Sequence, residues 1–449
     1  MNRKIALILV LAAAVLGVFL ALFPGRYLLA GAGVAALLLG VAAAIRPQLA
    51  MFGAVLAIPL VTNELALAIA LLSVGAWGLT LFYQKDARPA VTDLDLPIAL
   101  LVILLLVSTV ISVNPASSLP ELVTHFLAIG LFVAMVNVVK DRTALYRVVL
   151  AILAATTLVS LAGIYHYVTK APPPESGWVD LSQNPYLQAR AYSTFGNPNL
   201  LAMYLLFTAP LALALAMACR SYFKKAMFGS ILVTAGLCML LTFSRGGWAG
   251  LFVAIAGFGL LIDRRLCVVL VLVTVFAVMV LPKVDVVERR LASAGGGDTS
   301  VQYRLTVWNE ALLMIRDYWP IGVGLGHRAY MQVYPAYMLD RHKRPYHSHN
   351  QYLQLVIESG ILGLLLYGWI ALRVFRRTLD LIKHGQDRLP VAVSAAVTAA
   401  LLGILVMGLT DNILYRPKLI LTFWMVLGLG QAASLISSRR TGVEWPRCN

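Results

Sequence analysis

The sequence predicts an all-α, polytopic membrane protein: a transmembrane helical bundle with a small, partly helical domain in one of its loops. Three observations predict this fold class. The 449 residues are 60% hydrophobic and only 12% charged, which is too little charge to cover a soluble domain of this size. Apolar runs of about the length of a membrane span follow one another along the chain. Lysine and arginine are concentrated in every second connection between these runs.

The apolar runs predict 12, and at most 14, transmembrane helices. The first run has span length and lacks a clear cleavage site, so we interpret it as a span rather than a signal peptide. The two runs between residues 48 and 83 could instead form a re-entrant hairpin or shallow helices, which would leave twelve spans. Both counts are even and put the termini on the same side. The runs lie near 4–24, 27–45, 48–62, 65–83, 96–113, 120–139, 146–168, 199–218, 226–243, 247–263, 266–281, 352–373, 390–409 and 417–436.

The distribution of charge predicts the orientation of the chain. One set of alternate connections carries pairs such as Lys140 and Arg142, whereas the short connections of the other set are nearly free of lysine and arginine. The positive-inside rule therefore places both termini in the cytoplasm. It also accounts for the net charge of +16 without a nucleic-acid partner. The four cysteines have no paired spacing, so neither a disulfide framework nor a cysteine metal site is predicted.

Two long connections, at residues 169–198 and 282–350, are predicted to lie on the outer side. In the second, the stretch "VQYRLTVWNEALLMIRDYWP" has apolar residues at helical spacing. Thr299 or Ser300 would cap this helix and Pro320 would end it. We therefore expect an N-terminal transmembrane bundle (1–281), an outer loop domain (282–350), C-terminal transmembrane helices (351–437) and a cytoplasmic tail (438–449).

Three arginines on the predicted outer side are candidates for binding an anion. Arg245, in "FSRGGW", lies at the tip of a tight turn between spans, where the positive-inside rule disfavours it. Arg304 would lie in the first turn of the outer helix, where its charge opposes the helix dipole unless an anion binds there. Arg190 precedes "STFGNPN", whose turn and cap residues would hold the nearby backbone still. The alternatives are a snorkelling anchor for Arg245 and solvated charges for the other two.

His347 and His349, which precede the span at 352–373, allow three interpretations. They could bind a metal ion, although the loop lacks the cysteine and glutamate ligands of common zinc sites. They could belong to a polar helix entry, with Ser348 or Asn350 as the N-cap. One of them could be a general base, because an imidazole with a pKa of about 6.5 can take a proton from a sugar hydroxyl. The other possible metal ligands of this loop are His327, His342 and Asp340.

The sequence has no nucleotide-binding motif at a position where such a motif could function. Asp93 and Asp95 form a D-x-D pattern like that of metal-dependent sugar-nucleotide transferases, but they lie in a short connection on the predicted cytoplasmic side. No Walker or Rossmann fingerprint is present. We therefore predict no cofactor, and an activated substrate that already resides in the membrane.

The stretch "HNQYLQLVIESGILG" resembles the signature of the O-antigen ligase family, in which a histidine and an asparagine precede two spaced glycines. In this chain they are His349, Asn350, Gly360 and Gly363, directly after the longest loop. The stretches "SRGGW", "YRLTVWNEALLMIRDYWPIGVGLG" and "STFGNPN" also look like the superfamily that includes O-antigen polymerases and related oligosaccharyltransferases. The similar layout of spans and loops extends over most of the chain.

This resemblance implies a metal-independent, GT-C-like membrane glycosyltransferase of the bacterial inner membrane, with its active site at the periplasmic face. Its donor would be an O-antigen polysaccharide on undecaprenyl diphosphate, and its acceptor a sugar hydroxyl of the lipid A–core oligosaccharide. His349 would be the base of an inverting displacement. The diphosphate would be bound by Arg245, Arg304 and Arg190. The supporting residues would be Asn350, His347, Gly360 and Gly363, the glycines by allowing close packing.

Two other functions are compatible with parts of the sequence. An O-antigen polymerase would use the same residues but a second lipid-linked glycan as acceptor. A transporter of lipid-linked sugars would need charged residues near the membrane midplane and commonly has inverted repeats. The candidate residues instead gather at one face, and no repeat is evident.

Overall fold

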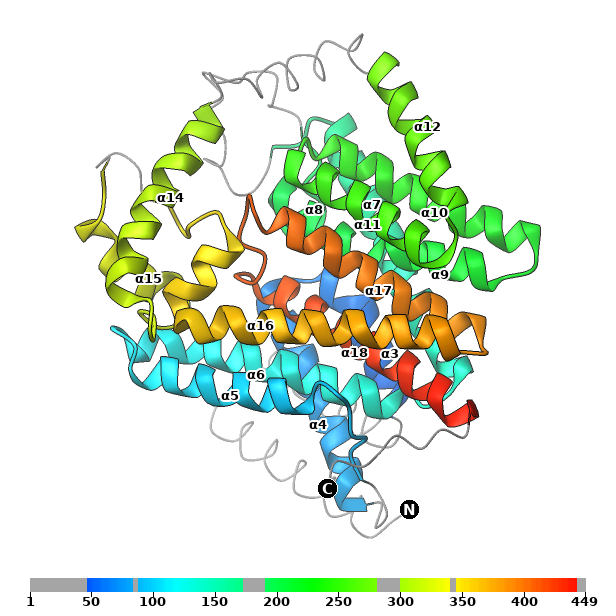
Figure 1. The fold of residues 1–449 in the computed structure, drawn as a ribbon, viewed down its shortest axis with the longest axis horizontal. Coiled ribbons are helices and arrows are strands. Elements are labelled where there is room, and N and C mark those ends of the chain that lie inside the picture. Colours follow the sequence, from blue (N-terminus) through cyan, green and yellow to red (C-terminus); the bar gives the residue numbers. More distant parts are fainter. Residues whose placement is uncertain (1–46, 84–87, 173–189, 281–298, 340–344, 442–449) are drawn as a thin grey trace, which may run out of the picture.

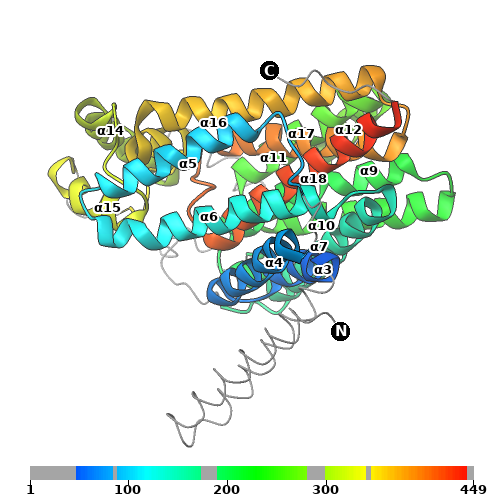
Figure 2. The ribbon, with the colours of Figure 1, turned by 90° about the horizontal axis from the view of Figure 1, so that it is seen from below.

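The computed structural model describes residues 47–83, 88–172, 190–280, 299–339 and 345–441. Every regular element in these segments is a helix, which confirms the all-α prediction. Helices α5, α6, α16, α17 and α18 run lengthwise along the bundle, and the helices between α7 and α12 cover one side of it (Figures 1 and 2).

The first half of the described chain forms α3 (Pro47–Ala57), η1 (Ile58–Leu60), α4 (Asn63–Tyr83), α5 (Asp95–Val110), α6 (Pro115–Val138), α7 (Arg142–Val168), η3 (Ser193–Phe195), α8 (Pro198–Thr208) and α9 (Pro210–Ala218). The second half forms α10 (Tyr222–Leu241), α11 (Arg245–Ile262), α12 (Arg265–Val280), α14 (Thr299–Tyr318), α15 (His327–Val333), η5 (Tyr334–Ala336), α16 (Gln351–His384), α17 (Arg388–Met407) and α18 (Pro417–Thr441).

Within the described residues, nine helical segments are long and apolar enough to cross a membrane, and three further apolar helices are shorter. These twelve correspond one by one to the predicted apolar runs from 48–62 onward. The chain is therefore a multi-pass membrane protein. In the ambiguous pair, α4 reaches span length, and α3 with η1 does not. The runs at 4–24 and 27–45 lie outside the described residues, so the total count stays a prediction.

Small residues allow the central helices to approach closely. A side chain at Gly250 of α11 would lie 2.7 Å from the carbonyl oxygen of Gly403 on α17. A side chain at Gly428 of α18 would lie 2.9 Å from the carbonyl oxygen of Phe132 on α6. Lipid tails are as apolar as a helix surface, so the hydrophobic effect does not drive membrane helices together. Close van der Waals packing of this kind holds them together instead.

The alternate connections of the bundle lie at opposite ends. At one end, Gln351 N–H at the start of α16 donates to the carbonyl oxygen of Gly408, after α17, over 2.8 Å. At the other end, Arg142 at the start of α7 lies 3.7 Å from Asp387, which precedes α17. Helices α14 and α15 lie at the first of these ends, beside the start of α16 (Figures 1 and 2). We call it the outer end.

The domain at the outer end shares its core with the transmembrane bundle. Ala311 and Met314 of α14 pack with Tyr330 of α15, with Val323, and with Ile357 of α16. The helix ends at Tyr318, as Pro320 predicts, but Thr299 and Ser300 lie inside the helix rather than at a cap. The shared core fixes α14 relative to the bundle.

Helix α16 is longer than predicted and is broken. It extends to His384, and Ser359 and Gly360 have non-helical backbone angles, with φ of +68° at Gly360. The carbonyl of Ile357, freed by the break, accepts a 2.7 Å hydrogen bond from Val323 N–H. The segment after α14 thus supplies hydrogen-bond partners at the break in α16. Backbone groups inside a membrane need such partners within the protein, because no water is available there.

Candidate active site

The segment before α16 carries both candidate histidines, and we call residues 345–350 the His loop. Its last residue, Asn350, is the N-cap of α16, and its side-chain oxygen accepts from the N–H groups of Tyr352 and Leu353 at 2.9 and 3.1 Å. The structure therefore selects Asn350 over Ser348 as the cap. Its amide nitrogen also donates to the carbonyl of Leu409 over 3.1 Å, which joins the His loop to the connection between α17 and α18.

His349 occupies a backbone conformation that residues with a side chain rarely adopt, with φ of +50°. Its N–H donates to Nδ1 of His347 over 3.1 Å, and its carbonyl accepts from Nε1 of Trp308 on α14 over 3.3 Å. The ring of Tyr303, one α14 turn earlier, meets the His349 ring edge-on at 5.7 Å between centroids. Residues on both sides thus hold a strained conformation, a pattern that is common at functional sites.

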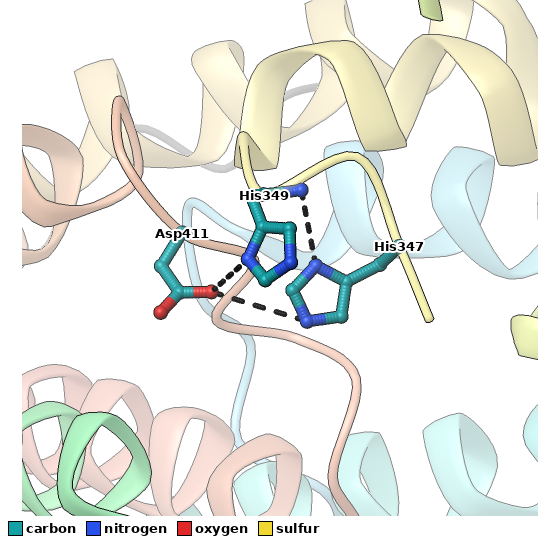
Figure 3. A group of neighbouring side chains, drawn as sticks. All are labelled: His347, His349 and Asp411. Atoms are coloured by element: carbon teal, nitrogen blue, oxygen red, sulfur yellow. Dashed lines mark hydrogen bonds and ion pairs between the residues drawn. The ribbon is translucent and has the colours of Figure 1, made fainter. Parts of the chain in front are cut away.

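Asp411 faces both imidazoles from the connection between α17 and α18 (Figure 3). Its Oδ1 atom lies 3.6 Å from Nδ1 of His349 and 3.9 Å from Nε2 of His347. Asn199 donates to its Oδ2 atom over 3.0 Å, and the backbone N–H of Asn412 donates to Oδ1 over 2.9 Å. The carboxylate is 5% exposed, so the protein holds it in place on every side.

The surroundings keep Asp411 ionised and His347 neutral. Burial alone would raise the pKa of Asp411, but the adjacent imidazoles of His349 and His347 and the positive charge of Arg304 lower this pKa to about 2. Burial lowers the pKa of His347 to about 3, so its ring carries no charge at neutral pH. A fixed negative charge therefore lies beside His349, whose side chain is 24% exposed.

Arg190 is buried and bound within the protein. Its Nε donates to the carbonyl of Thr242 over 2.6 Å, and its Nη2 donates to the amide oxygen of Asn199 over 3.3 Å. Asn199 in turn donates to Asp411. The structure thus brings Arg190 to the site as one end of a hydrogen-bonded chain that leads through Asn199 to the carboxylate facing His349.

Arg245 lies at the N-terminus of α11, beside the same connection. Ser244 caps this helix with its side chain, which accepts from the N–H of Gly247 over 3.4 Å. The following residue, Gly246, is so close to Thr410 that a side chain there would meet the threonine hydroxyl. Thr410 precedes Asp411, so the helix terminus that presents Arg245 packs next to the candidate carboxylate.

Arg304 lies on α14 and its charge acts on Asp411. The prediction that placed Arg304 in the first turn of its helix is wrong, because α14 extends back at least to Thr299. The dipole of a helix acts mainly on its first and last turns, so the dipole argument for an anion at Arg304 no longer applies. What places Arg304 at the site instead is the packing of α14 on the His loop through Trp308.

The two glycines of the motif shape the break in α16. A side chain on Gly360 would collide with the carbonyl of Pro320, and its φ of +68° is one that glycine adopts readily. A side chain on Gly363 would collide with the hydroxyl of Ser359. This hydroxyl donates to the carbonyl of Leu355 over 3.0 Å, which holds it in that position. The close approach expected from their small size therefore involves the outer segment at Gly360 and the helix's own Ser359 at Gly363.

His347, His349 and Asp411 also form a group that could hold a metal ion by distance alone, since their candidate ligand atoms lie within 4.8 Å of one another. The hydrogen bonding of His347 does not fit this. Its Nδ1 accepts a hydrogen bond from His349 N–H, so in the neutral ring the proton is on Nε2, the atom that faces Asp411. A metal-binding nitrogen must be free of its proton, and ligand histidines ordinarily donate from the other nitrogen.

The remaining histidines of the metal hypothesis do not complete such a site. His327 stacks on Tyr346, with ring centroids 4.3 Å apart, and its Nδ1 is 2.8 Å from the Tyr346 carbonyl oxygen. His342 and Asp340 lie outside the described residues. The donor set therefore fits an acid–base site better than a metal centre.

Sequence reasoning missed Asp411, Asn199 and Gln354, which is 2% exposed in the first turns of α16. One signal could have found Asp411: it is an acidic residue between two spans, in "MGLTDNILYRP", and ionisable residues at membrane level are functional by default. Asn199 is the last residue of "STFGNPN", a pattern that predicts a turn and nothing more. Nothing in the local sequence distinguishes Gln354 from an ordinary helix residue.

The arrangement of His349 and Asp411 can transfer a proton, because the imidazole lies next to the negative charge of the carboxylate. A buried carboxylate that faces one ring nitrogen of His349 fixes the orientation of the ring and stabilises its protonated form. The other ring nitrogen is then the one that can take a proton from a substrate. Arg245 at the start of α11 and Arg304 on α14 supply positive charge at the same end of the bundle.

Residues 230–368, just under a third of the chain, match the sequence profile of a family described as O-antigen ligase. The matched stretch contains Arg245, Arg304, His349 and both motif glycines, whereas Arg190 and Asp411 lie outside it. A comparison with curated proteins found no match. Over this stretch the chain is similar to the O-antigen ligase family, in agreement with the resemblance carried by the motif at the start of α16.

Proposed function

We propose that the protein is an O-antigen ligase. It transfers a polysaccharide from undecaprenyl diphosphate to a sugar hydroxyl of the lipid A–core oligosaccharide. The observation that carries this proposal is the position of His349, which lies 3.6 Å from a buried, ionised Asp411 at the end of the bundle where the arginines lie. The reaction needs no metal and no nucleotide, because the diphosphate of the lipid-linked donor is itself the leaving group.

His349 is the general base. Asp411 faces the Nδ1 side of the ring, which leaves the lone pair of Nε2 to remove the proton of the acceptor hydroxyl. The hydroxyl oxygen then forms a bond to the anomeric carbon of the donor, and the bond from that carbon to the diphosphate oxygen breaks. The electron pair leaves with the diphosphate, and the proton stays on His349 beside Asp411. Attack opposite the leaving group inverts the anomeric centre, as in other single-displacement transferases.

Arg245 and Arg304 bind the diphosphate and stabilise the negative charge that grows on it as the sugar leaves. Their helices meet the connection that carries Asp411 from two sides, α11 at Thr410 and α14 through the His loop. A guanidinium binds phosphate oxygens in pairs, which fixes the orientation as well as the charge. The contacts of Arg190 support a different part for it: through Asn199 it holds Asp411 in place.

We also propose that the outer end faces the periplasm and that both termini are cytoplasmic. The support is the charge pattern, since Lys140, Arg142, Lys383 near the end of α16 and Arg388 at the start of α17 lie at the opposite end. In a cysteine-free background, Arg316→Cys on α14 should react with a membrane-impermeant maleimide in spheroplasts. Lys383→Cys near the end of α16 should react only after permeabilisation, and the reverse pattern would contradict the orientation.

The acceptor decides between a ligase and a polymerase, and one experiment separates them. Purified protein is incubated with an undecaprenyl-diphosphate glycan and either lipid A–core or a second lipid-linked glycan. We expect extension of lipid A–core, and loss of this product in a folded His349→Ala variant. Extension of the lipid-linked glycan alone would identify a polymerase, and full activity of His349→Ala would contradict the assigned base.

A further inference from the structure

The backbone of the His loop is held by an amide deeper in α16. Ser348 is fully buried, and its N–H donates to Oε1 of Gln354 over 2.9 Å. Its hydroxyl donates to the carbonyl of Asn350 over 2.9 Å, across the residue between them. That residue is His349, in its strained conformation. The Gln354 side chain therefore fixes the peptide that sets the direction of the candidate base.

The direction of the Gln354 amide is itself determined. Its Nε2 donates to Oε1 of Glu358 over 2.8 Å, one helical turn farther along α16. The oxygen and nitrogen of an amide have nearly the same size, so only the partners decide which points where. A backbone N–H can only donate, so Ser348 takes the oxygen of Gln354 and leaves its NH₂ group to donate to Glu358.

Glu358 lies at the break in α16, where the outer domain meets the helix. Its carbonyl, freed by the break, accepts from Gly324 N–H over 3.2 Å. A side chain on Gly322 would lie 2.5 Å from the same carbonyl carbon, so the segment after α14 packs directly on this residue. The position of Glu358 is thus fixed from outside the helix, and the hydrogen bonds run from there to Gln354 and Ser348.

We propose that Gln354 is a positioning residue for the glycosyl transfer: it holds Ser348 so that His349 faces Asp411, and Glu358 holds Gln354 by accepting from its NH₂ group. The inference rests on the proposed function, because it takes His349 as the base. Gln354 touches neither substrate nor reacting atoms in this account. Its loss therefore changes the rate of the chemical step and leaves binding of donor and acceptor unaltered.

The first test is Gln354→Leu in the purified transfer assay. Misplacement of a base by a fraction of an ångström reduces turnover sharply, so we expect kcat to fall by about tenfold or more, with both KM values unchanged. The control is Gln332→Leu on α15. Gln332 also bridges the outer domain and the bundle, through Asn114 at 3.1 Å and the carbonyl of Val113 at 3.3 Å, but does not contact the His loop. It should keep wild-type kcat.

The second test exchanges the two side chains. Gln354→Glu alone removes the NH₂ group that donates to Glu358 and places two carboxyl groups side by side, so it should lose activity. In the double variant Gln354→Glu/Glu358→Gln, the carboxylate at 354 accepts from Ser348 N–H and the NH₂ group at 358 donates to that carboxylate. Both hydrogen bonds are restored, so the double variant should recover most of the lost kcat. Each variant is first checked for membrane insertion and for an unchanged melting temperature in detergent.

The outcomes separate this inference from the function on which it rests. Wild-type kcat in folded Gln354→Leu, together with an inactive His349→Ala, would overturn the positioning role alone. The same holds if the folded double variant is no more active than Gln354→Glu. Full activity of His349→Ala would instead overturn the proposed base.

Discussion

His349 Nδ1 lies 3.6 Å from Asp411 Oδ1, although one residue precedes α16 and the other follows α17. The distance is longer than a hydrogen bond, as is common for catalytic pairs without substrate. The relationship gives the histidine motif a partner from outside the stretch that matches the O-antigen ligase profile. Most of the chemistry that we propose depends on this pair.

Asp411→Asn should reduce glycosyl transfer strongly. The amide is nearly isosteric but has no charge to stabilise the protonated His349, so turnover should fall on the order of 100-fold. The measurement is kcat with lipid-linked donor and lipid A–core. Asp317→Asn is the matched control: Asp317 lies on α14, accepts from Tyr337 over 2.7 Å and is away from the His loop. Equal activity of Asp411→Asn and Asp317→Asn would show that the carboxylate is not needed.

The two histidines should respond differently to substitution. His349→Ala should lose transfer, whereas His347→Gln should keep a large part of it, because a glutamine oxygen can still accept from His349 N–H. If the base were His347, the order of the two effects would be reversed. The comparison is made at saturating donor and acceptor, so that it reports turnover.

His347 also makes stability depend on pH. Its pKa is about 3 in the folded protein and about 6.5 when solvated, so the unfolded state binds more protons between these values. Folding is therefore destabilised as the pH falls from about 6.5 towards 3. The pKa of Asp411 is lowered from 3.8 to about 2, so its own contribution is lost as the pH falls from 3.8 towards 2, below the interval from pH 7 to 4. Melting temperatures in detergent from pH 7 to 4 should fall less steeply in His347→Gln than in the wild type.

Lysine should not replace the arginines that bind the diphosphate. A lysine keeps the charge but loses the paired N–H donors, so Arg245→Lys and Arg304→Lys should each reduce kcat/KM for the donor by about 100-fold. Arg316→Lys, with a side chain 81% exposed on α14, should have no effect. Wild-type kinetics in both test variants would reject the two arginines as a diphosphate site.

Gly360→Ala should destabilise the protein and lower transfer. The positive φ and the contact with Pro320 both exclude a side chain, and such strain costs more than ~1 kcal/mol. Gly368→Ala on the same helix is the control, since nothing lies within 4 Å of the position where its side chain would be. We expect a lower melting temperature only for Gly360→Ala. Equal melting curves would mean that the break in α16 tolerates a side chain.

Transfer should continue after exhaustive chelation. The hydrogen bond into Nδ1 of His347 puts its proton on the nitrogen that a metal would need. Activity is measured after dialysis against a chelator and again after addition of divalent ions. Loss of activity that a specific ion restores would assign the group of His347, His349 and Asp411 to a metal centre.

The sequence by itself determined the class of fold and much of the site's position. Membrane spans are read from length and apolarity, both local properties, and the twelve described apolar helices appear where the runs predicted them. The cap at Asn350 and the special role of Gly360 could also be expected from the motif, because caps and close packing depend on residue type at fixed spacing.

The tertiary structure decided which residues act together. Asp411 reaches His349, and Arg190 reaches Asp411 through Asn199, across helices that no local pattern relates. The predicted helix start, which put Arg304 in the first turn, is wrong. The sequence pattern determines the ends of a helix less well than its presence. The break in α16, and with it the bond from Gln354 to Ser348, arises where the segment after α14 supplies N–H groups to freed carbonyls. These hydrogen-bond partners are far apart in the sequence and are brought together by packing. The periodicity of apolar residues is a local property and does not predict them.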